Sequence, residues 1–180
     1  MKRTWFRVVI ALALATPFAK AQLGSSSGTT TITVTVGAEA ALTVSSSTSL
    51  TTIGTNFTNY TSSSPTTVTY FVRTTQSTGS GTITLKVTSD FSPANGPSVT
   101  TPPTAGDALK YTCGATGVAT PCSGSQTAST SSSTPVATFG ADAHTDTAGS
   151  TATTSWTLTN DPKYKTGTYN ATVTFTISAS

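Results

Sequence analysis

The chain of 180 residues has room for one domain, and about 70 of its residues are threonine or serine while only 8% are charged. Threonine favours strands, and leucine, lysine and glutamate are scarce, so the composition predicts an all-β fold and excludes long amphipathic helices. The formal charge of +3 depends on four basic residues in the first 20 positions. Beyond them, five basic residues stand against six acidic ones, and this balance excludes a basic surface for nucleic acid.

Residues 1–21 have the features of a secretion signal. A basic start precedes the short apolar run 8–15, and a small-x-small cleavage pattern ends at Ala21. The apolar run is too short to span a bilayer as a permanent helix, so we expect no integral membrane segment. The mature chain is therefore expected to begin at Gln22 and to be secreted, to the extracellular space or the cell surface.

The next segment, residues 22–36, is expected to form an N-terminal arm. Its first part, residues 22–28, has the glycine- and serine-rich composition of a flexible linker. After the linker, threonines alternate with Ile32, Val34 and Val36. Such an alternation predicts a strand with one apolar face.

Residues 37–180 are expected to form the folded domain. Alternating apolar and polar residues predict strands at 40–44, 50–53, 66–74, 82–88, 108–113, 136–139, 151–158 and 167–177. The strands 66–74 and 82–88 are joined by a short glycine-containing loop and are expected to pair as a hairpin. About seven to nine short strands predict a β-sandwich of the immunoglobulin type, with a closed barrel as the competing architecture.

The only two cysteines, Cys113 and Cys122, are predicted to form a disulfide because the chain is expected to be exported. The bond would close a loop of about ten residues and contribute roughly 2.5–3 kcal/mol in the chain-entropy model. Two thiols and one histidine make a poor zinc site, so we do not expect zinc there.

A candidate metal site lies in the polar loop before residue 151. Every second position there is occupied by Asp142, His144 and Asp146, whose side chains would face one way on an extended segment and could bind a metal ion. Gly140 and Gly149 flank the segment, which is also typical of a solvated acidic loop. We favour the loop and expect neither a bound metal nor another cofactor.

No catalytic residues are expected. The chain has a single histidine, and no G-x-S-x-G segment presents a serine nucleophile. The six acidic residues are scattered and offer no placed pair of carboxylates for a glycosidase. We therefore do not expect an enzyme.

The aromatic residues have two interpretations. The segment Trp156-Thr157-Leu158 is similar to the W-x-L motif of a cell-wall-binding surface domain, but we favour Trp156 and Leu158 as core residues on one strand face. A sugar-binding face could use Tyr60, Phe71, Tyr111 and Tyr164, although their spacing does not separate this role from ordinary packing.

The three-residue pattern for N-glycosylation occurs three times in the chain, beginning at Asn56, Asn59 and Asn170.

The order of segments resembles the spore-coat-protein-U and chaperone–usher pilin group of secreted, immunoglobulin-like subunits. The resemblance lies in T-I-T-V-T-V directly after the signal, A-A-L-T-V-S, the central pair of strands, L-K-Y-T-C and the closing G-T-Y-N-A-T-V-T-F-T-I. It spans nearly the whole mature chain, and the closing segment is its most specific part.

This resemblance implies a homopolymer assembled head to tail. In such subunits an N-terminal strand of one copy fills the groove of the next, which is strand addition, and a contact that does not close generates a filament. The strand 30–36 would be donated, with Ile32, Val34 and Val36 as its apolar side chains. The alternative is that the same strand folds back into its own domain, leaving a monomeric surface adhesin or carbohydrate-binding module.

Overall fold

The computed structural model describes residues 28–45, 47–52, 54 and 56–180. Residues 35–180 form one compact unit, whose described residues contain strands and turns but no helix. The expected signal segment 1–21, residues 22–27 of the arm and Ile53 lie outside the described residues.

Eleven strands are present in this described part of the chain. In order they are β1 (Glu39–Val44), β2 (Leu50–Thr52), β3 (Tyr60–Ser62), β4 (Thr66–Arg73), β5 (Gly81–Ser92), β6 (Leu109–Ala115), β7 (Thr120–Pro121), β8 (Gln126–Thr127), β9 (Thr134–Phe139), β10 (Ser150–Leu158) and β11 (Asn170–Ala179). The prediction of an all-β fold is confirmed, and threonine provides much of its strand material.

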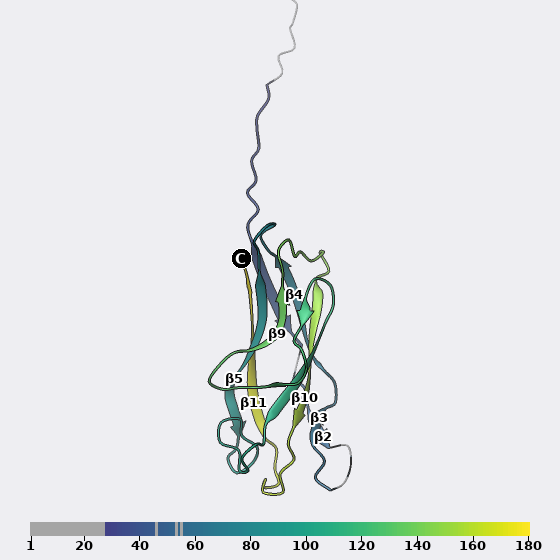
Figure 1. The fold of residues 1–180 in the computed structure, drawn as a ribbon, viewed down its shortest axis with the longest axis vertical. Helices are drawn as coiled ribbons and strands as arrows, with labels where there is room; N and C mark the ends of the chain where they lie inside the picture. The colour runs from purple at the N-terminus through teal and green to yellow at the C-terminus, as the bar shows by residue number, and fades with distance from the viewer. Residues whose placement is uncertain (1–27, 46, 53, 55) are drawn as a thin grey trace, which may run out of the picture. The chain divides into compact units, whose positions relative to one another are not determined.

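The strands form two antiparallel sheets that make a β-sandwich (Figure 1). The larger sheet has the order β1-β4-β10-β3-β2, with β6 on the opposite edge of β10 and β8 beside β6. The smaller sheet has the order β11-β5-β9-β7, and Figure 1 shows β11 in yellow beside β5 in teal. The outer strands β1 and β11 belong to different sheets and lie next to each other.

The core lies between the sheets and follows the alternation of the strands. In the larger sheet Val68 and Tyr70 are fully buried, and in the smaller sheet Ile83 and Leu85 are at most 1% exposed. Trp156 is 4% exposed, and its indole N–H donates to the Thr66 hydroxyl over 3.0 Å. The interpretation of Trp156 as a core residue is therefore confirmed.

The hairpin expected between β4 and β5 is absent, because the two strands belong to different sheets. Both edges of β4 are occupied, by β1 and by β10, and β5 pairs with β9 and β11. The connection crosses between the sheets and is held by long-range backbone bonds, from Thr74 N to Ala143 O and from Thr75 N to Ser180 O, both 2.9 Å. The short glycine-containing loop was compatible with a hairpin, but the occupied edges of β4 decided the pairing.

Several strands differ from the prediction, and three of them show why. The short strand β3 forms within a segment expected to be a loop, because β10 and β2 pair with it on either side. Strand β5 continues to Ser92, past the expected end at residue 88, and β11 begins at Asn170 instead of residue 167. In each case the length is set by the partner strand, which local sequence does not specify.

The predicted disulfide between Cys113 and Cys122 is present, with a Cα–Cα distance of 5.4 Å. It joins the end of β6 to the segment that follows β7. The backbone N–H of Cys122 donates to Val136 O over 2.9 Å, which ties this segment to β9 in the other sheet. The disulfide therefore holds a loop that touches both sheets.

Candidate functional site

The arm has a strong strand pattern but forms no strand. Residues 28–38 are assigned no secondary structure, and Ile32, Val34 and Val36 are 85%, 76% and 63% exposed. A segment becomes a β-strand only when its backbone is hydrogen-bonded to a neighbouring strand. The alternating side chains of this segment are therefore not used in the described fold. Contiguous exposed apolar side chains of this kind are uncommon on monomeric proteins.

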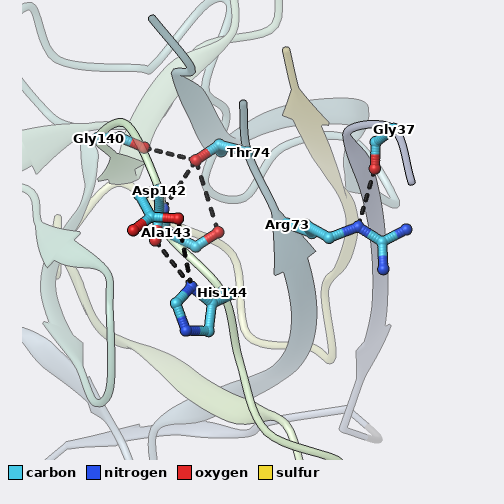
Figure 2. A network of polar contacts seen from close by, with 7 residues as sticks. All are labelled: Gly37, Arg73, Thr74, Gly140, Asp142, Ala143 and His144. Carbon is cyan, nitrogen blue, oxygen red and sulfur yellow. Dashed lines mark hydrogen bonds and ion pairs between the residues drawn. The ribbon is translucent and has the colours of Figure 1, made fainter. Parts of the chain in front are cut away.

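The root of the arm is attached to β4 through Arg73. The Arg73 Nε donates to the Gly37 carbonyl oxygen over 2.8 Å, as Figure 2 shows, and its terminal nitrogen lies 3.0 Å from Glu39 Oε2. The two charged side chains are 46% and 77% exposed. The ion pair is therefore worth only about 0–1 kcal/mol, and its main effect is to define the course of the chain into β1.

The sandwich is open beside the end of β1, at Val44, and the first part of β11. The inward-facing side chains of β1 are only partly covered, and Val44 is 43% exposed although its alternation points it inward. Ala171 and Val173 of β11 are likewise half-buried. By contrast, Val68 at the centre of the same sandwich is fully buried. Apolar surface of this kind is what an additional strand would cover.

A groove with a volume of about 890 Å³ opens at this edge. Its walls are the chain that leaves β1 on one side and the chain that leads into β11 on the other. The apolar and aromatic lining consists of Val44, Leu50, Phe57, Tyr60, Phe91, Pro97, Leu109, Trp156, Leu158, Tyr164, Tyr169, Ala171, Val173 and Phe175. The groove is thus a continuation of the core to the surface.

The groove lies beside the outer strand of the larger sheet, at the junction of β1 and β2. The pairings Glu39↔Arg73 and Leu50↔Ser62 fall in the same register, so β1 and β2 are two parts of one edge strand. Between them Ser45 N donates to Thr67 O over 2.7 Å and Ser63 N donates to Ser49 O over 2.9 Å, and residues 45 and 47–49 line the groove. On the neighbouring strand Pro65, which has no N–H to donate, lies in the break between β3 and β4.

The sequence candidates for a metal site are not gathered around one point. The backbone turns at Asp142, where φ is +55°, so the segment is not extended there. His144 Nδ1 lies 2.8 Å from the Asp142 backbone oxygen (Figure 2), while Asp146 Oδ1 accepts the N–H of Ala148 over 2.9 Å. Among the described residues, no three side chains of histidine, cysteine, aspartate or glutamate are placed to hold a metal ion.

The four aromatic residues considered for sugar binding are not brought together. Tyr60 and Tyr164 line the groove, whereas Phe71 lies exposed on the outer face of β4 and Tyr111 is 1% exposed in the core. Tyr169, from the expected strand 167–177, also lines the groove, as do Phe57 and Phe91, which the sequence did not single out. Phe57 lies in a loop and Phe91 near the end of β5, where no periodicity marks a side chain as part of a site.

These features define an all-β sandwich with an open apolar groove at one edge and an unpaired, alternating N-terminal arm. Comparison with known proteins adds no family to this description, because no family model, curated protein or solved structure matches the chain. In the part of the chain that the structure describes, no helix has the length and apolar character needed to cross a membrane.

Proposed function

We propose that this protein is a secreted structural subunit that polymerises head to tail into an extracellular fibre, pilus or coat by strand exchange. In this proposal the sandwich is of the immunoglobulin type, and the segment 30–36 of one copy enters the groove of the next. The observation that carries the proposal is the pair of incomplete features on one chain. The alternating apolar segment 30–36 has no partner strand among the described residues, and the groove beside the end of β1 and the first part of β11 has no strand to cover it.

The length of the segment 30–36 agrees with the length of the groove. Seven extended residues span about 23 Å at about 3.3 Å per residue. The β11 side of the groove includes residues 169–173 and Phe175, a stretch of the same length. The arm from residue 28 to residue 36 carries no charged residue, which suits an apolar groove. The match supports insertion of the arm as a strand beside β11.

Energetics favour the same pairing. Burying each of the side chains Ile32, Val34 and Val36 would stabilise the contact between copies by roughly 1.5–3 kcal/mol, before the cost of ordering the arm. Strands β1 and β11 are outer strands with one unpaired edge in the described sheets, and such edges are hazards for aggregation. Strand addition satisfies these backbone groups and lets the apolar side chains of the inserted strand fill the groove.

Secretion is part of the proposal. The disulfide between Cys113 and Cys122 is compatible with an extracellular location, because such bonds persist in oxidising compartments. The basic start, the apolar run and the cleavage pattern in residues 1–21 support export by the same reasoning.

The test is electron microscopy and size-exclusion chromatography of the protein beginning at Gln22. We expect filaments from the wild type and monomers from Ile32→Asp or Val34→Asp, because a charged side chain cannot enter the apolar groove. The matched control is Thr33→Asp, whose side chain would face the opposite side of the inserted strand and should leave filaments intact. Filaments from Ile32→Asp, or equal loss of filaments with Thr33→Asp, would reject strand exchange.

A second function, a monomeric surface adhesin or carbohydrate-binding module, is favoured by the aromatic lining of the same groove. Phe57 is 61% exposed, and Tyr60, Tyr164 and Asn160 also line the groove. Flat aromatic surfaces beside polar groups suit the faces and hydroxyls of sugars. Glycan-array binding by a strictly monomeric wild-type sample, lost with Tyr60→Ala, would support this function over the first.

A further inference from the structure

Tyr169 joins two loops at the end of the groove where β11 begins. One loop, residues 93–98, follows β5, and the other, residues 159–169, leads into β11. Both loops line the groove, the first through Pro97 and the second most continuously through residues 164–169. Because the loops are far apart in the sequence, their relative position depends on the contacts between them.

The pairing of β5 with β11 is irregular at this end of the groove. Asn170 pairs with Ser92 and Thr172 pairs with Ser89, so two residues of β5 stand opposite one residue, Ala171. A β-bulge of this kind leaves a residue unpaired and disrupts the ladder locally. The first residues of β11 border the groove, and the ladder alone therefore holds them less firmly than it holds the rest of β11.

The ring of Tyr169 lies between two glycines, one from each loop. A Cβ atom added at Gly96 would overlap the ring, and one added at Gly167 would lie 3.6 Å from it. Neither glycine has a φ angle in the left-handed region, so the backbone conformation does not require glycine at either position. At Gly96 the requirement comes instead from the space that the ring occupies.

Hydrogen bonds near the Tyr169 hydroxyl connect the same two loops. The hydroxyl donates to the Lys165 carbonyl oxygen over 2.8 Å, within its own loop. The Lys165 N–H donates to the Asn95 carbonyl oxygen over 3.0 Å, and that oxygen lies 3.5 Å from the Tyr169 hydroxyl. Tyr169 therefore packs on the first loop through its ring and restrains the second loop through its hydroxyl.

We propose that Tyr169 is a positioning residue of the groove, which holds the start of β11 in place for an inserted strand. The inference rests on the proposed strand exchange and names the residue that prepares the accepting wall. Pairing with an edge that is already ordered avoids the entropy cost of ordering that edge during binding. The Tyr169 hydroxyl bonds to its own loop, so its removal tests the position of β11 separately from contact between the ring and the inserted strand.

The test measures binding of a fluorescent synthetic peptide of residues 28–37 to the Ile32→Asp variant, in which the groove is intact and the arm is blocked. Fluorescence anisotropy gives the Kd. We expect Gly96→Ala in this host to weaken binding by roughly tenfold or more, because the added methyl group displaces the ring. The matched control Gly140→Ala, at a glycine with open space around it, should bind the peptide as tightly as the host does.

Tyr169→Phe is a second variant, which keeps the ring and removes only the hydroxyl. The loss of one hydrogen bond predicts binding weaker by roughly two- to tenfold. Circular dichroism shows whether each variant folds, and Tyr169→Phe decides the inference even where Gly96→Ala does not fold.

A double-mutant cycle separates positioning by the ring from general damage to the loop. In a Tyr169→Ala host the methyl group of Gly96→Ala no longer meets a ring, so we expect Gly96→Ala to have no further effect on the Kd. A further loss of the same size as in the Tyr169 host would assign the effect to the loop itself and overturn the positioning role.

Failure of the inference and failure of the proposed function give different results. If the Ile32→Asp host does not bind the peptide, strand exchange is rejected and the positioning role with it. If the host binds the peptide and a folded Gly96→Ala or Tyr169→Phe variant binds it equally tightly, the positioning role alone is rejected and strand exchange stands.

Discussion

Arg73 donates a hydrogen bond from Nε to the Gly37 carbonyl oxygen, 2.8 Å away, at the point where the arm joins the sandwich (Figure 2). Arg73→Gln should remove this bond while changing the free energy of unfolding by only about 0–1 kcal/mol, as expected for an exposed pair. If the bond aids strand exchange by restricting the root of the arm, filament growth should slow, measured by light scattering. Glu39→Gln removes the ion pair but keeps the bond to Gly37, and should grow at the wild-type rate.

The groove can be tested separately from the arm. Val173 is half-buried on the β11 wall of the groove, so Val173→Glu should block entry of a strand and prevent filaments without unfolding the domain. The control Thr176→Glu lies on the exposed face of β11 and should leave filaments intact. Circular dichroism would confirm that both variants fold.

A mixture of two blocked variants gives a sharper prediction. Val173→Glu keeps a functional arm and Ile32→Asp keeps a functional groove, so mixing them should produce a heterodimer that cannot grow. Size-exclusion chromatography with light scattering would detect it. A mixture that stays monomeric, or one that forms long filaments, would contradict the pairing of arm and groove.

Acid stability should depend on Asp90, which follows the long central part of β5. Burial alone would raise its pKa, but hydrogen bonds from Val99, Ser98, Thr100 and Phe91 lower the pKa to about 2. Because this value lies below the ordinary 3.8, the stabilisation is present above pH 3.8 and is lost as the pH falls toward 2. Urea unfolding of Asp90→Asn should show a smaller loss of stability in that window than the wild type shows. An equal loss in both proteins would assign acid sensitivity to other groups.

Removal of the disulfide should weaken the fold without affecting the groove. The double variant Cys113→Ser, Cys122→Ser is expected to lose roughly 2.5–3 kcal/mol of the free energy of unfolding, because its unfolded chain is no longer restricted. Urea unfolding measures this loss. Both cysteines lie outside the groove lining, so filaments should still form below the unfolding temperature. Loss of filaments in a folded double variant would indicate that the disulfide loop takes part in assembly.

Part of the candidate site was visible in the sequence. The alternation around Val34 marked the arm, and the alternation of β11 marked the side chains that face the core. The groove itself was not predictable, because Phe57 reaches it from an irregular segment that carries no periodic pattern.

The sequence by itself determined the class of fold, the two faces of most strands and the disulfide. These properties are local: a period of two places alternate side chains on opposite faces, and two cysteines have only one possible pairing within the chain. The tertiary structure alone decided that β4 and β5 lie in different sheets, and that a groove opens beside the end of β1 and the first part of β11. Such choices depend on which strand edges are already occupied and how much apolar surface each pairing covers, and those quantities exist only once the chain is folded.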